Sequence, residues 1–262
     1  MKIASIILFF CVTALLALGM VMLISASTGQ AVTPKYLLLQ PIWCIVGFLV
    51  CWLATMGDYR LLKKHPWVPW TMLGGVALLL LLVLVPGIGT RVKGASRWLK
   101  AGPITIQPSE LAKICLIIVI AWYGERFQRQ MGTFWRGMVL PGAFIGAIIG
   151  LLFLEPDVGT SMLMACVSSV MLLVAGIRWR FFLPPLILGM IAISVFLYNN
   201  PMRSERIYSW LHVEETKQDK GMQAFQAMVA LGSGGIYGVG LGDGRQKLGF
   251  VPEHQTDFIY SV

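Results

Sequence analysis

The chain has 262 residues, of which 57% are hydrophobic and 13% are charged, with a mean hydropathy of +0.75. Soluble domains carry about 25% charged residues, so this composition excludes an ordinary soluble domain and indicates a membrane protein. The net charge of +9 does not indicate nucleic-acid binding, because the basic residues lie in short clusters between apolar runs and not on one soluble face.

Long apolar runs follow one another along the chain. A run of about 20 apolar residues crosses a bilayer core of about 30 Å as an α-helix. Only helices and closed barrels satisfy the backbone in lipid, and these runs are too long for barrel strands. We therefore predict an all-α, polytopic transmembrane helical bundle. Its seven full spans are expected at about 4–25, 36–56, 67–87, 106–123, 138–154, 158–176 and 181–198.

The basic residues between these spans predict the orientation. The N-terminus and every second loop together carry nine Lys and Arg residues, whereas the opposite short loops carry five. The positive-inside rule therefore places the N-terminus in the cytoplasm. Four of those five residues lie in the outer segment 88–105, and a local exception of this kind indicates that function placed the charge there.

The segment 199–258 is long and polar, unlike the short loops that precede it. We expect it to be a large extracytoplasmic loop, and loops of this length are usually functional or disordered. Apolar residues from Phe225 to Leu231 indicate a helical piece within it. The residues from Phe258 onward look like the start of an eighth span, so we expect 1–262 to be one membrane domain that is truncated at its C-terminal end.

Two charged residues lie at the start of the fourth span. Glu110 and Lys113 are three residues apart, which places them on one face of a helix and close enough to pair. Charges inside a membrane span are costly, and they mark either a structural ion pair or a functional site. The residues alone leave both interpretations open.

The outer segment 88–105 contains Arg91, Lys93, Arg97 and Lys100 and no acidic residue. Clusters of Arg and Lys at a membrane surface commonly hold phosphate groups, Arg as a fork and Lys as a point charge. We therefore predict a phosphate-binding surface here. The alternative is an anchor for lipid headgroups.

Further acidic residues lie near the expected outer boundary. Asp157 precedes the sixth span, where it is placed to cap that helix, and its carboxylate would also face whatever the basic segment 88–105 binds. Glu253 and Asp257 precede the incipient eighth span. A carboxylate at a membrane boundary can hold a raised pKa and act as a general base, but an Asp before an apolar run is also a common helix cap.

Five motifs, taken together, resemble the SEDS family (shape, elongation, division and sporulation), which includes FtsW and RodA. They occur in family order and with family spacing over essentially the whole chain. The motifs are Gly94–Leu99, Gln107–Lys113, Glu155–Thr160, the glycine-rich stretch 232–242 and Pro252–Phe258. The loop is slightly more similar to FtsW than to RodA, chiefly in Arg245–Phe250.

The resemblance implies a ten-helix membrane protein that polymerises glycan strands from lipid II beside a class B penicillin-binding protein transpeptidase. It also implies roles for particular residues. The essential carboxylate of the family matches Asp257, its intramembrane acid–base pair matches Glu110 and Lys113, and its acidic residue after the fifth helix matches Asp157. Glu253 is an accessory acid near the proposed base.

Transfer onto a lipid-linked sugar needs a base for the acceptor hydroxyl and positive charge for the departing pyrophosphate. Asp257 is the expected base, and Arg97 and Lys100, with Arg91 or Lys93, are the expected pyrophosphate ligands. A divalent cation such as Mg²⁺ or Mn²⁺ could share that charge, although no cluster of metal ligands is readable. Two alternatives are a lipid II flippase and a non-catalytic scaffold that activates the transpeptidase. The expected location is the bacterial cytoplasmic membrane, among membrane lipids.

Overall fold

The computed structural model describes residues 2–27, 34–58, 60–92, 95–102, 104–218, 221–235, 238–240 and 243. The chain forms two compact units. One consists of Met1–Gly57 together with Ile193–Val262, and the other consists of Asp58–Ala192.

The first unit holds the N-terminal helices α1 (Lys2–Ser27) and α2 (Pro34–Met56), which contact each other. The rings of Phe9 and Phe48 lie 5.9 Å apart between them. The unit also contains the end of α8 (Trp179–Asn199) and two further helices, α9 (Pro201–Leu211) and α10 (Met222–Gly234). Helix α10 confirms that the Phe225–Leu231 stretch is helical.

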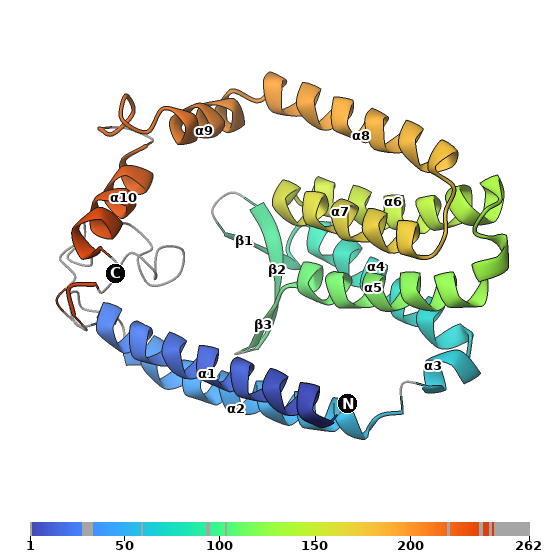
Figure 1. Ribbon diagram of the computed structural model, residues 1–262, viewed down its shortest axis with the longest axis horizontal. Coiled ribbons are helices and arrows are strands. Elements are labelled where there is room, and N and C mark those ends of the chain that lie inside the picture. Colours follow the sequence, from blue (N-terminus) through green and yellow to red (C-terminus); the bar gives the residue numbers. More distant parts are fainter. Residues whose placement is uncertain are drawn as a thin grey trace. The chain divides into compact units, whose positions relative to one another are not determined.

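The second unit is a helical bundle in which α5 contacts α4, α6 and α7 (Figure 1). The segment between α5 and α6 contains a short 3₁₀ turn, Gln128–Gln130, and a π-helical turn, Trp135–Val139. The helices of the unit are α3 (Arg60–Lys64), α4 (Trp67–Leu84), α5 (Pro108–Arg126), α6 (Leu140–Leu154), α7 (Val158–Val174) and the first part of α8 (Trp179–Asn199).

The core of the bundle lies along one face of α5. Ala112, Leu116, Ile120 and Tyr123 recur every three or four residues, so they share a face of the helix, and each is at most 2% exposed. They belong to one buried cluster with apolar residues of α4, α6 and α7. The Tyr123 hydroxyl donates a hydrogen bond of 2.6 Å to the carbonyl oxygen of Arg136, which satisfies this buried polar group.

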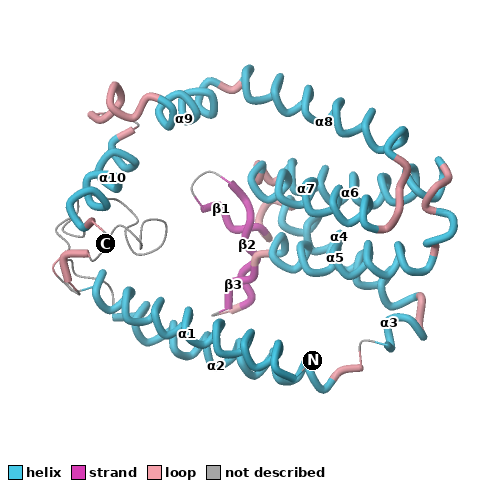
Figure 2. The backbone as a smooth tube through the Cα atoms, in the orientation of Figure 1, coloured by secondary structure: helices cyan, strands magenta, loops and turns pink. Residues whose placement is uncertain are grey.

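Three short antiparallel strands connect α4 to α5 at one end of the bundle (Figure 2). They are β1 (Gly89–Val92), β2 (Ala95–Ala101) and β3 (Ile104–Ile106), in that spatial order. Leu99 in the central strand lies opposite both Gly89 and Ile106. The sheet contacts α4 and α5. From the sequence we expected a loop in this segment, so the sheet is an addition to the predicted all-α architecture.

All seven expected spans are helices. Five of the described helices, at Ile3–Ser25, Leu37–Met56, Trp67–Leu84, Trp135–Leu154 and Trp179–Asn199, are long and apolar enough to cross a membrane. Helix α7 is shorter, with 17 residues, and α5 carries four charged residues within its 19. Many large apolar side chains of α1, α2 and α8 are exposed, as expected for surfaces that face lipid or other membrane helices.

Candidate functional site

Arg97 in β2 reaches the turn between α6 and α7. Its Nη2 donates a hydrogen bond of 2.8 Å to the Pro156 carbonyl oxygen, and its Nε donates a longer one of 3.4 Å to the Glu155 carbonyl oxygen. Its Nη1 lies 3.9 Å from Oδ1 of Asp157. The planar guanidinium spreads its donors over a fixed fork that faces three consecutive residues, whereas a lysine ammonium is a compact point charge. Arg97 therefore ties the sheet to the end of α6 and the start of α7.

Asp157 is the N-cap of α7. Its Oδ1 accepts a hydrogen bond of 3.3 Å from the Thr160 backbone N–H, and its backbone carbonyl accepts one of 2.8 Å from the Ser161 hydroxyl. The helix cap expected from the sequence is present, and the same carboxylate lies 3.9 Å from Arg97 of the 88–105 segment. The cap satisfies a backbone donor that the first helical turn leaves unpaired.

Glu155 is the group at this turn that the sequence analysis did not single out. Its side chain is 0% exposed, and no donor from the described part of the chain reaches either carboxyl oxygen. Burial raises the pKa of the Glu155 carboxyl from 4.5 to about 7; the nearby Asp157 raises this pKa as well, and Arg97 lowers it. An isolated buried carboxylate is costly, so this group favours its neutral, protonated form.

Of the other three basic residues of the 88–105 segment, two lie on the sheet and one lies outside the described residues. Lys100 is exposed near the end of β2. Arg91 lies in β1, where its backbone pairs with Ser96 of β2. Lys93 lies outside the described residues. The sheet thus carries Arg91, Arg97 and Lys100 on paired strands at one end of the bundle, beside the 155–157 turn.

Glu110 and Lys113 form an ion pair in the first turns of α5. The Glu110 Oε2 lies 2.7 Å from the Lys113 Nζ, as the three-residue spacing predicted. The Glu110 side chain is 58% exposed, so the pair is not deeply buried within its own unit. A carboxylate in the first turn also interacts favourably with the positive end of the helix dipole.

The two predicted acids near residue 255, Glu253 and Asp257, lie outside the described residues. Within the described part of the chain, no three His, Cys, Asp or Glu side chains gather in a group that could hold a metal ion.

The helices and the charged end of the bundle define a class, a polytopic helical membrane protein with a small sheet at one membrane boundary. The chain belongs to the family of FtsW, RodA and SpoVE, described as cell cycle proteins, whose sequence profile matches residues 5–262. This family is the one that the five motifs resembled.

Similar proteins support the assignment. A probable peptidoglycan glycosyltransferase FtsW of Geobacter metallireducens is 39% identical over 260 residues, which is 95% of this chain and 67% of that protein. The probable peptidoglycan glycosyltransferase FtsW of Geobacter sp. (strain M18) is 36% identical over 251 residues, 93% of this chain and 67% of that protein. These names support the predicted similarity to FtsW. The chain spans about two thirds of the length of these relatives.

Solved structures show the same fold. The crystal structure of the rod shape determining protein RodA of Thermus thermophilus is 30% identical with a TM-score of 0.59, covering 72% of this chain and 58% of that one. A peptidoglycan synthase complex that coordinates polymerization and crosslinking gives 30% identity and a TM-score of 0.68, covering 87% of this chain and 65% of that one.

Proposed function

We propose that this protein is a peptidoglycan glycosyltransferase that polymerises lipid II into glycan strands at the outer face of the bacterial cytoplasmic membrane. The observation that carries the proposal is the match of nearly the whole chain to relatives named as peptidoglycan glycosyltransferases. The similarity to a peptidoglycan synthase complex supports a class B penicillin-binding protein transpeptidase as partner. The basic-residue count supports a cytoplasmic N-terminus.

The proposed chemistry needs a base and a positively charged surface. We assign the base to Asp257, which would take the proton from the acceptor hydroxyl, with Glu253 as an accessory acid. Lys100, together with Arg91 and Lys93, would stabilise the charge of the departing undecaprenyl pyrophosphate. Lys100 supports this role because its side chain is exposed on the sheet.

Arg97 receives a modified role. Its three guanidinium nitrogens face the 155–157 turn, so their donors are directed to that turn. We propose that Arg97 acts as a positioning residue, which holds Asp157 and the start of α7 beside the basic sheet. It contributes to pyrophosphate binding through the placement and charge of that surface.

The test is glycan-strand synthesis from purified lipid II by the full-length protein with its transpeptidase partner. We expect Asp257→Asn to lower the rate by at least about 100-fold, because general-base catalysis contributes about 10²–10⁴-fold and an amide can still cap a helix. Asp243→Asn, which changes an exposed acid of the same 199–258 segment, is the matched control and should stay within a few-fold of wild type.

Three outcomes would contradict the proposal. Synthesis by Asp257→Asn within a few-fold of the wild-type rate, at matched folded concentration, would remove Asp257 as the base. Failure of the wild-type protein to make glycan strands, combined with transport of lipid II between leaflets of a vesicle, would support a flippase. Growth restored by a folded Asp257→Ala protein would support a scaffold.

A further inference from the structure

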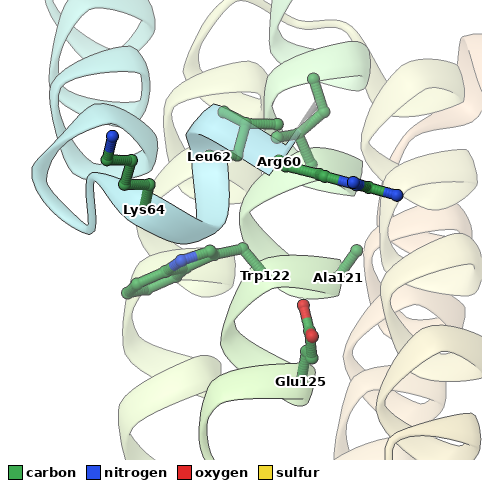
Figure 3. A pocket seen from close by; sticks show the side chains of 7 residues that line it. Arg60, Leu62, Lys64, Ala121, Trp122 and Glu125 are labelled. Carbon is green, nitrogen blue, oxygen red and sulfur yellow. The ribbon is translucent and has the colours of Figure 1, made fainter. Parts of the chain in front are cut away.

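A cavity of about 670 Å³ lies between the short helix α3 and the last turns of α5 (Figure 3). This volume is within the range of about 300–1,000 Å³ that is typical of small-molecule sites. Basic and apolar side chains of α3 line one side, and apolar and aromatic side chains with one carboxylate of α5 line the other. The lining residues used below are Arg60, Leu62, Lys64, Ile118, Trp122 and Glu125.

The cavity lies at the membrane boundary opposite the sheet. Helix α5 has 19 residues and is therefore about 28 Å long, close to the thickness of a bilayer core. Its first turn follows the sheet, and its last turns line the cavity. Trp67, Trp135 and Trp179, each at least 61% exposed, lie where α4, the π-helical turn before α6, and α8 begin at that far boundary. Exposed Trp residues mark the headgroup level of a membrane.

The basic side chains of the cavity suit a phosphodiester. Arg60 and Lys64 are four residues apart on α3, and their charged ends extend to opposite sides of that helix (Figure 3). Arg and Lys are the usual donors to phosphate, and basic sites between helices at a membrane boundary suit lipid headgroups.

The apolar wall of the cavity is fixed in place. Trp122 is 8% exposed, and its indole meets that of Trp70 edge-on at 6.1 Å between ring centroids. Ile118 of α5 and Leu62 of α3 continue the apolar surface. Basic side chains beside an apolar wall at headgroup level complement a phospholipid. The basic groups match its charged phosphate, and the apolar wall matches the adjoining glycerol and acyl chains.

We propose that this cavity binds the headgroup of an anionic glycerophospholipid. The phosphodiester lies on Lys64, on the side of Trp122, and Arg60 adds positive charge from the other side of α3 (Figure 3). The glycerol and first acyl methylenes lie against Leu62, Ile118 and Trp122. The site is separate from the Arg97 turn and from glycan synthesis, because it lies at the other end of α5. Under the proposed orientation it faces the cytoplasmic leaflet.

The test is native mass spectrometry of the delipidated full-length protein in detergent, with phosphatidylglycerol as the probe. We expect phosphatidylglycerol to bind at least tenfold more tightly than phosphatidylcholine. The double variant Arg60→Gln with Lys64→Gln should weaken phosphatidylglycerol binding at least tenfold. The matched control, Arg129→Gln with Arg180→Gln, removes two exposed basic residues outside the cavity at the same boundary and should stay within about twofold of wild type.

Thermal unfolding of each variant checks that it is folded. The exchange Arg60→Lys with Lys64→Arg keeps both charges and should retain phosphatidylglycerol binding. Unchanged binding by the double-glutamine variant, or an equal loss in the control pair, would overturn the proposal. So would tighter binding of undecaprenyl pyrophosphate, which would assign the cavity to a lipid-linked substrate. Displacement of phosphatidylglycerol by equimolar inorganic phosphate would show a free-anion site instead, and would also overturn it.

Discussion

Replacing Glu155 by glutamine tests whether the buried carboxyl between α6 and α7 is neutral in the folded protein. Burial raises its pKa from 4.5 to about 7. At about 1.36 kcal/mol per pKa unit, the difference corresponds to about 3 kcal/mol. The folded state holds the proton more tightly than the unfolded state, so the free energy of unfolding falls as pH rises from about 4.5 to about 7 and changes little from this source above that.

Glutamine resembles the protonated carboxyl and does not ionise, so the Glu155→Gln variant avoids this loss. We expect it to be more stable than wild type by up to about 3 kcal/mol at pH 8 and nearly equal to it at pH 4.5. The assay is reversible unfolding in mixed micelles, followed by tryptophan fluorescence at both pH values. Glu214→Gln, at an exposed position, is the control and should change stability by less than about 0.5 kcal/mol at either pH.

The outcome that would refute this reasoning is equal stability of wild type and Glu155→Gln at pH 8. That result would mean that the carboxylate is charged and stabilised in the folded protein. A variant that is less stable than wild type at pH 8 would refute it more strongly, because it would show that the charged form makes favourable contacts.

Three further predictions concern the remaining charged groups and the orientation. Arg97→Lys should lower stability and glycan synthesis nearly as much as Arg97→Ala, by about 1–3 kcal/mol in unfolding experiments, because the compact ammonium does not reproduce the guanidinium fork that faces both carbonyls and the Asp157 carboxylate. Full rescue by lysine would show that only charge matters. Because Glu110 is 58% exposed, Glu110→Gln and Lys113→Gln should each cost about 1 kcal/mol or less, and a loss of folded protein in either would contradict this. Gln218→Cys, in a protein without its native cysteines, should react with an impermeant thiol reagent in intact spheroplasts; labelling only after lysis would reverse the proposed orientation.

The helices were predictable because their signal is local. An apolar run of span length can satisfy its backbone in lipid only as a helix, whatever the rest of the chain does. The sheet at 89–106 was not predicted, because strand pairing depends on partners distant in sequence and the segment's basic residues resemble those of a loop. Its register places Leu99 between Gly89 and Ile106, and its strands contact α4 and α5, which lie outside the segment.

The candidate site was also predictable only in part, because contacts between residues close in sequence could be foreseen and contacts between distant residues could not. The Asp157 cap and the Glu110–Lys113 contact follow from short sequence spacings, and both are present. Glu155 stands beside a proline in a polar stretch, so nothing local predicts a side chain that is 0% exposed. The contacts of Arg97 join residues 58 positions apart. From the charge of Arg97 alone we predicted that it binds the pyrophosphate, whereas in the fold its guanidinium contacts the 155–157 turn.

That separation of 58 residues also has a consequence for biosynthesis. At about 5–20 residues per second, the ribosome needs about 3–12 s to add the residues between Arg97 and the turn that it binds. During that interval the rest of the sheet, α5 and α6 are added after α4, and the carbonyl and carboxylate partners of Arg97 are added only at its end. The guanidinium must remain hydrated until α6 and α7 arrive. A nascent chain halted before Glu155 should therefore present a sheet whose arginine is open to solvent, and completion of the α6–α7 hairpin is the step that closes it.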